Sequence, residues 1–193
     1  MSIIDGAVKK PEDVFAAMKD YDSLLERTLD RANPTPMQLE VIKLIKDGFS
    51  LADIFDITQE QRDSLFAQAC KMMHVGDIKR ARAFLIALLE IEPRDWRVVY
   101  VLGGTFQAEG KYAAAAKIYL YFISRDATNP EGYLRLGECF LAAREYENAK
   151  AMFAGAHVQA EQGYGGPQTA AYAWRKIEEV DALVAEQKRT ATN

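Results

Sequence analysis

Residues 102–119 read LGGTFQAEGKYAAAAKIY, and residues 136–153 read LGECFLAAREYENAKAMF. Leucine, glycine, phenylalanine, tyrosine, alanine and an aromatic residue recur in the same order, with a period of 34 residues. The pattern continues one period upstream, where apolar or small residues keep the same spacing. The matching sets are Ala81, Ala115 and Ala149; Leu85, Tyr119 and Phe153; Met72, Phe106 and Phe140; and Leu65, Val99 and Tyr133. The sequence therefore predicts three repeats, at 62–95, 96–129 and 130–163.

Each repeat has the pattern of a helical hairpin. Apolar residues follow helical spacing in the first half, a break follows, and helical spacing resumes in the second half. The break holds Gly76 and Gly110 in two copies, where a residue without a Cβ most easily forms a left-handed cap. Arg144 stands there in the third copy, so that turn is expected to differ or to carry strain. The period and the small-residue pairs resemble the tetratricopeptide repeat, which implies an all-α solenoid.

The ends of such a solenoid need caps, because each repeat buries its apolar surface only against its neighbours. After the GYGGP break at 163–167, Ala173, Ile177, Val180 and Val184 lie on one face of a predicted helix. We therefore expect a C-terminal capping helix and tail over 164–193. Tyr172 and Trp174 are placed to clamp this helix onto the third repeat.

Two further segments precede the repeats. Thr35-Pro36 with Gln38 predicts a helix start, and SLADIFDIT at 50–58 reads as a short apolar link, so 34–61 is an N-terminal helix and lead-in. Residues 1–33 form an N-terminal extension. An apolar stripe there predicts an amphipathic helix, which either forms a dimer or packs on the protein's own repeats; its members are Val14, Met18, Tyr21 and Leu25.

Composition argues against several classes of function. The net charge is −4 with scattered basic residues, so nucleic acid is not an expected partner. No stretch approaches the roughly 18 continuous apolar residues of a membrane span, and the N-terminus has no secretion signal. Two isolated cysteines and two isolated histidines form no metal frame or catalytic triad. We therefore expect a cytoplasmic binding protein with no metal or cofactor, not an enzyme.

The first helix of each repeat has one face that does not pack within the repeats, so this face is available to a partner. In tetratricopeptide proteins it forms the concave wall. Most of its residues are apolar, and such patches usually mark partner sites. Gly104 would admit a partner backbone, while Tyr100 and Gln107 would offer it hydrogen bonds. The alternative is that the superhelix or the N-terminal segment buries these residues. The predicted peptide-binding residues are Phe66, Cys70, Met73, Tyr100, Gly104, Gln107, Leu134 and Leu141; Glu138 shares this wall.

The stretch SLADIFDITQEQRDSLFAQACKMMHVGDIKRARAFLIALLEIEPRD, followed by WRVVYVLGGTFQAEGKYAAAAKIY, is similar to the class II chaperones of type III secretion, the SycD/LcrH type. The resemblance covers roughly residues 40–185. It implies a bacterial cytoplasmic chaperone that binds the N-terminal segment of two hydrophobic translocator proteins, a motif of Pro-x-Leu-x-x-Pro character, in its groove. The residues matching the family's groove are Phe66, Met73, Tyr100, Gln107, Leu134 and Leu141.

The resemblance has departures and rivals. Residues 1–33 exceed the family's usual N-terminal extension, and the family often forms homodimers through N-terminal helices, here either the 1–33 stripe or the 37–45 helix. A co-chaperone that reads a C-terminal carboxylate is disfavoured, because Phe66 and Cys70 stand where lysine and asparagine are needed. A generic tetratricopeptide assembly scaffold of a secretion or pilus apparatus is the main alternative.

Overall fold

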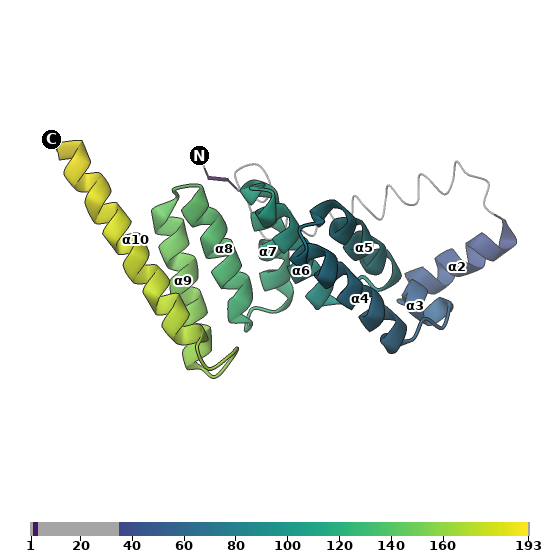
Figure 1. The fold of residues 1–193 in the computed structure, drawn as a ribbon. Coiled ribbons are helices and arrows are strands. Elements are labelled where there is room, and N and C mark those ends of the chain that lie inside the picture. The colour runs from purple at the N-terminus through teal and green to yellow at the C-terminus, as the bar shows by residue number, and fades with distance from the viewer. Residues whose placement is uncertain (1, 4–34, 193) are drawn as a thin grey trace.

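The structure, a computed structural model, describes residues 2–3 and 35–192, and every regular element within 35–192 is an α-helix. The stripe of Val14, Met18, Tyr21 and Leu25 therefore lies outside the described residues. Figure 1 shows the helices following one another in an extended, curved row. In chain order they are α2 (Pro36–Lys46), α3 (Leu51–Ile54), α4 (Gln59–His74), α5 (Ile78–Ile91), α6 (Trp96–Ala108), α7 (Tyr112–Arg125), α8 (Pro130–Ala142), α9 (Tyr146–Glu161) and α10 (Thr169–Thr192).

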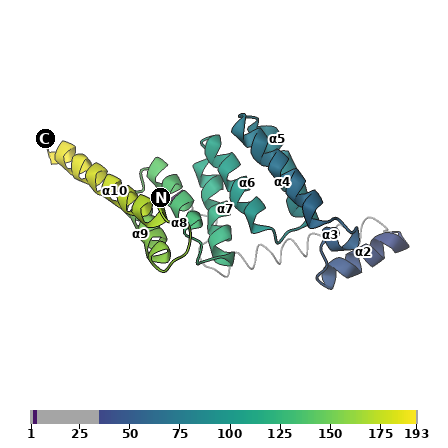
Figure 2. The same ribbon diagram turned by 60° about the horizontal axis from the view of Figure 1, so that its bottom comes forward.

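The predicted hairpins are α4–α5, α6–α7 and α8–α9, which confirms the all-α tetratricopeptide solenoid. From α4 onward each helix packs on the next one along the chain, and α10 packs mainly on α9 as a cap. The first helices of successive units also meet, α4 with α6 and α8 with α10. Figure 2 shows the hairpins stacked in this order. The arrangement places α4, α6, α8 and α10 along one wall of the solenoid.

Capping side chains define where the N-terminal helices begin. Thr35 and Gln38 form a reciprocal capping box at the start of α2, and Thr58 and Gln61 form one at the start of α4. The helix start at Thr35 was predicted from the sequence. Ser50 and Asp53 form a third box, so the segment expected to be a link contains the short helix α3.

The turns inside the hairpins are left-handed. Gly76 and Gly110 have φ angles of +82° and +70°, as the position of these glycines predicts. Arg144 adopts the same conformation with a φ of +60°. A residue with a Cβ pays roughly 1–2 kcal/mol there, so the strain expected in the third hairpin is present.

Aromatic rings of each second helix pack directly on backbone of the first. The ring of Tyr119 in α7 lies so close to Gly103 in α6 that an added Cβ would stand 2.6 Å from it. Phe153 in α9 has the same relation to Gly137 in α8, at 2.7 Å. Both aromatic side chains are almost fully buried. The repeated glycine–aromatic pairs of the sequence are therefore the contacts that set the helix spacing.

Alanine substitutions at the neighbouring Gly103 and Gly104 are expected to distinguish the effect of helix packing from the effect of helix propensity. Gly103→Ala should lower the free energy of unfolding by about 1–3 kcal/mol, because the Tyr119 ring has to move. At Gly104 an added Cβ would make only ordinary contacts, 3.6 Å to Met73 and 3.7 Å to Tyr119. Gly104→Ala should therefore be neutral or gain up to about 1 kcal/mol of helix propensity. Urea denaturation of both variants checks this, and equal losses would contradict the packing described.

The capping helix is held by an apolar seam and two aromatic side chains. Ala173, Ile177 and Val180 are buried, as the sequence pattern predicts. Tyr172 reaches α8, where its hydroxyl donates to Glu138 at 3.1 Å. Trp174 lies against the ring of His157 in α9, with the ring centroids 5.4 Å apart. Both predicted clamps therefore contact the third repeat.

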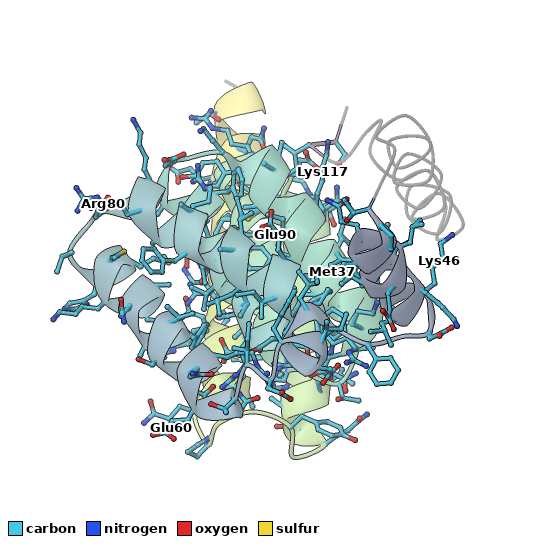
Figure 3. The ribbon with its side chains drawn as sticks, turned by 90° about the vertical axis from the view of Figure 1, so that its right-hand side faces the viewer. Met37, Lys46, Glu60, Arg80, Glu90 and Lys117 are labelled. Atoms are coloured by element: carbon cyan, nitrogen blue, oxygen red, sulfur yellow. The ribbon has the colours of Figure 1, made fainter. Side chains whose placement is uncertain are left out.

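The opposite end of the solenoid leaves apolar surface uncovered. α2 has no buried residue, and its main contacts are with α3. Met37 is 77% exposed and Leu39 is 54% exposed. Figure 3 views this end, with Met37 and Lys46 of α2 standing apart from Glu60 and Arg80 of the α4–α5 hairpin. Among the described helices none combines the length and hydropathy needed to cross a membrane.

Candidate functional site: a groove with two pockets

Two adjoining cavities open along the wall of first helices. One, here called the aromatic pocket, lies between α4 and α6 and has a volume of about 410 Å³. The other, here called the polar pocket, lies between α8 and α10 and has a volume of about 450 Å³. Glu131 lines both. The aromatic pocket is lined by Phe66, Trp96, Arg97, Tyr100, Val101, Phe122, Asp126, Asn129 and Glu131. The polar pocket is lined by Glu131, Leu134, Arg135, Glu138, Gly166, Pro167, Gln168, Thr169, Tyr172 and Arg175.

The walls of the aromatic pocket are held by ring packing. The Tyr100 ring lies 5.5 Å from the Phe122 ring, and Trp96 meets Tyr121 edge to face at 5.9 Å. The guanidinium of Arg97 lies 5.3 Å from the Phe66 ring centroid. Aromatic walls fixed in this way form a preformed apolar site for a side chain of a partner.

The guanidinium of Arg97 is anchored by two carboxylates. Its Nη2 lies 2.8 Å from Asp63 and 2.7 Å from Asp95. These hydrogen bonds raise the pKa of Arg97. The cation at the edge of the aromatic pocket is therefore already paired within the protein.

A hydrogen-bond network centred on Glu138 forms the floor between the pockets. Its carboxylate accepts from Nε2 of Gln107 at 2.8 Å, from Nη1 of Arg135 at 3.0 Å and from the Tyr172 hydroxyl at 3.1 Å. Oε1 of Gln107 in turn accepts from the Tyr119 hydroxyl at 3.0 Å. The network ties α6, α7, α8 and α10 together, so the capping helix is fixed to the same wall as the repeats.

The network continues to the aromatic pocket through Tyr100. Nε of Arg135 donates to the Tyr100 hydroxyl at 3.0 Å, and this hydroxyl donates to Oε2 of Glu131 at 3.3 Å. Burial raises the pKa of Tyr100, so its phenol stays protonated at neutral pH and remains a donor. Tyr100 thus lines the aromatic pocket, and its hydroxyl bonds to Arg135 and Glu131, two residues that line the polar pocket.

The structure brings some of the predicted site residues together. Phe66 and Tyr100 line the aromatic pocket side by side. The terminal methyl group of Met73 lies beside Gly104, 3.6 Å from the place where a Cβ would stand. All four residues lie on α4 and α6, and their predicted role in peptide binding stays a prediction. Backbone at Gly104 is partly covered by Met73, so the close approach predicted there requires Met73 to move.

The other predicted residues lie differently. Leu134 is only 4% exposed and belongs to the core, and it lines the polar pocket. For this residue the alternative holds, namely that the superhelix itself buries it. Leu141 is half-buried against the same core cluster, and Cys70 is half-buried outside both pockets. Both polar groups of Gln107 are bonded within the protein, and Tyr100 is bonded too. The hydrogen-bonding groups that these two side chains were expected to offer to a partner therefore already bond within the protein.

Several residues of the groove were not predicted. Trp96 and Phe122 line the aromatic pocket, and Tyr172 and Arg175 line the polar pocket. Phe122 comes from a second helix and Tyr172 from the cap, so the repeat offsets of the first helices do not point to them. Trp96 could have been found from the sequence, because it is a large aromatic residue directly after the N-cap residue Asp95.

Cysteine alkylation is expected to distinguish the two thiols. Cys139 is fully buried, and burial raises the pKa of its thiol to about 12. Cys70 is only half-buried, and burial raises the pKa of its thiol as well. Because the thiolate is the reactive form, iodoacetamide should modify Cys70 first, faster as pH rises, with Cys139 protected until unfolding. Mass spectrometry of the modified peptides checks this. Equal rates in the folded protein would contradict the burial of Cys139.

Several solved structures similar to this chain come from type III secretion. A type III secretion complex from Aeromonas hydrophila is 25% identical with a TM-score of 0.66, and the match covers 76% of this chain and 97% of that one. PcrH in complex with the chaperone-binding region of PopD is 25% identical with a TM-score of 0.60, over 66% of this chain and 96% of that one. The translocator chaperone SycD of Yersinia enterocolitica has a TM-score of 0.62 at 23% identity, over 70% of this chain and 98% of that one.

These matches define the class that the chain resembles. Its fold is that of the tetratricopeptide chaperones of type III secretion, and the predicted resemblance to class II translocator chaperones is confirmed. No protein-family model matches the chain, and no curated protein matches it significantly.

Proposed function

We propose that this protein is a bacterial cytosolic chaperone of a type III secretion system. It binds an extended N-terminal segment of a hydrophobic translocator protein in its groove and keeps that client soluble before export. The observation that carries the proposal is the aromatic pocket, where Phe66, Trp96 and Tyr100 stand open on the wall of first helices. The similar structure of PcrH holds the chaperone-binding region of PopD. We assign the protein no catalytic step.

The energetics of such a site favour an apolar anchor. Burial of one leucine-sized side chain contributes about 1.5–3 kcal/mol. The rings are fixed before binding, so little conformational entropy is lost in forming the pocket. A translocator carries membrane-inserting segments that aggregate in water, and covering part of its apolar surface opposes that aggregation.

Co-expression tests the proposal. The translocator encoded in the source genome is produced alone, with the wild-type chain, and with the chain carrying Phe66→Ala. We expect the wild-type chain to move the translocator into the soluble fraction and to copurify with it, and the variant to do so poorly. A translocator that stays insoluble beside abundant wild-type protein would contradict the function.

The uncovered end of the solenoid suggests self-association. The exposed apolar side chains of this end are Met37, Leu39, Ile45 and Phe49, and an exposed patch of this kind favours a partner surface. We propose a homodimer through α2, with Leu39→Glu shifting it to the monomer. Sedimentation velocity over a range of concentrations measures this shift. A wild-type protein that is monomeric at every concentration would contradict it.

A further inference from the structure

Glu131 stands at the junction of the two pockets. It is the second residue of α8, is partly buried, and lines both cavities. The Tyr100 hydroxyl donates to its Oε2 at 3.3 Å. The carboxylate is therefore held where the two cavities meet.

No described cation neutralises this carboxylate. Arg135 follows it at the favourable i, i+4 spacing, yet Arg135 pairs with Glu138 at 3.0 Å and donates to Tyr100. Arg97, the cation of the aromatic pocket, is shared by Asp63 and Asp95. Within residues 35–192 no lysine or arginine nitrogen lies within 4.0 Å of the Glu131 carboxylate.

A second carboxylate adds to the negative charge of the aromatic pocket. Asp126 also lines that pocket, and its carboxylate accepts a hydrogen bond from the Thr128 hydroxyl at 2.8 Å. Its carboxylate makes no ion pair with the described residues. In the polar pocket, Arg175 comes from α10, the opposite wall, where it lies 5.9 Å from the Tyr172 ring centroid. Of the charged side chains that line the aromatic pocket, Arg97 is thus paired within the protein while the carboxylates of Glu131 and Asp126 form no ion pair with the described residues. A further cation, Arg125, lies 5.7 Å from the Trp96 ring centroid.

We propose that Glu131 selects client segments that carry a lysine or arginine within two residues of the apolar anchor, an inference that rests on the proposed groove function. The anchor fills the aromatic pocket, and the stem of the basic side chain lies on the Tyr100 ring. Its charged head meets the Glu131 carboxylate, with Asp126 adding to the attraction. Long basic side chains suit this place because their stems are apolar and only their ends are charged.

Glu131 also has a structural role in helix α8, which has to be distinguished from its role in selecting the client. An acidic residue in the first turn stabilises a helix through the helix dipole. Glu60 provides a matched control, because it is likewise the second residue of its helix, α4, and lines neither pocket. A role in helix stability alone would make the two residues behave alike.

Fluorescence anisotropy with short labelled peptides tests the proposal. The peptides carry one Pro-x-Leu-x-x-Pro core with neutral residues, and lysine, glutamine or glutamate is placed at one variable position at a time. At one position or more, we expect lysine to bind the wild-type protein about three- to tenfold more tightly than glutamine, with glutamate weaker still. The gain should shrink as salt is added.

The variants make the result decisive. Glu131→Gln should bind the lysine and glutamine peptides equally well, Glu131→Lys should prefer the glutamate peptide to the lysine peptide, and Glu60→Gln should keep the preference for lysine. A lysine preference that survives in Glu131→Gln, or its absence at every position in the wild type, would overturn the proposal while the neutral peptide still shows groove binding. Failure of every peptide to bind would overturn the groove function together with the proposal.

Discussion

Phe66→Ala is expected to weaken binding of the client segment at least roughly thirtyfold, which corresponds to about 2 kcal/mol. Phe66 forms one wall of the aromatic pocket, and its removal takes away the ring against which the apolar anchor packs. Alanine is preferred to glutamate because Arg97 lies over this ring and would pair with a carboxylate placed there. Isothermal titration of the wild type and the variant with the same translocator peptide measures the loss.

The control for this variant is Phe55→Ala. Phe55 is 63% exposed and lies outside both pockets, so its loss should leave the affinity unchanged. Phe66 is partly buried, and its removal should also lower the free energy of unfolding by about 1–2 kcal/mol. Thermal melts establish that Phe66→Ala is folded at the temperature of the titration. Equal affinities of the wild type and a folded Phe66→Ala would contradict the assigned pocket.

Phe153→Ala is expected to lower the free energy of unfolding by about 3–5 kcal/mol. The side chain is fully buried and rests on the backbone at Gly137, so its removal leaves a cavity in the core. Because the cap packs on α9, the loss should reach α10 as well. Urea denaturation followed by circular dichroism gives the magnitude.

Val158→Ala serves as the matched control on the same helix. Val158 is 51% exposed, and a surface substitution of this kind usually changes stability by less than about 0.5 kcal/mol. Similar small losses at both positions would mean that the third repeat is not packed around Phe153. A large loss at Val158 would mean that this face of α9 is covered by a partner.

The fold could be predicted because its determinants are local and repeated. Glycine and an aromatic residue recur at one spacing, Gly103 with Tyr119 and Gly137 with Phe153, and the structure places each pair in contact. Thr35 marks the start of α2 by its capping box with Gln38. Arg144 marked the strained turn because it replaces a glycine. Each of these features acts over a few residues or within one hairpin.

The site could be predicted only in part because it depends on which helices meet. The offset rule finds Phe66 and Tyr100 on neighbouring first helices, but it does not show that Leu134 turns into the core. It also treats Gln107 as free, whereas Glu138 from the next repeat bonds to it. Residues 1–33, apart from Ser2 and Ile3, lie outside the described part of the chain. Their predicted amphipathic helix therefore stays a prediction.

Photo-crosslinking from the apolar anchor tests the central claim most directly. A translocator peptide carrying photo-leucine at the leucine of its Pro-x-Leu-x-x-Pro core is bound to the full chain and irradiated, and the joined residues are identified by mass spectrometry. The account predicts crosslinks to the lining of the aromatic pocket, with Phe66, Trp96 and Tyr100 foremost. Crosslinks confined to α2, α5 and α9, which contribute no residue to the lining of the aromatic pocket, would contradict it.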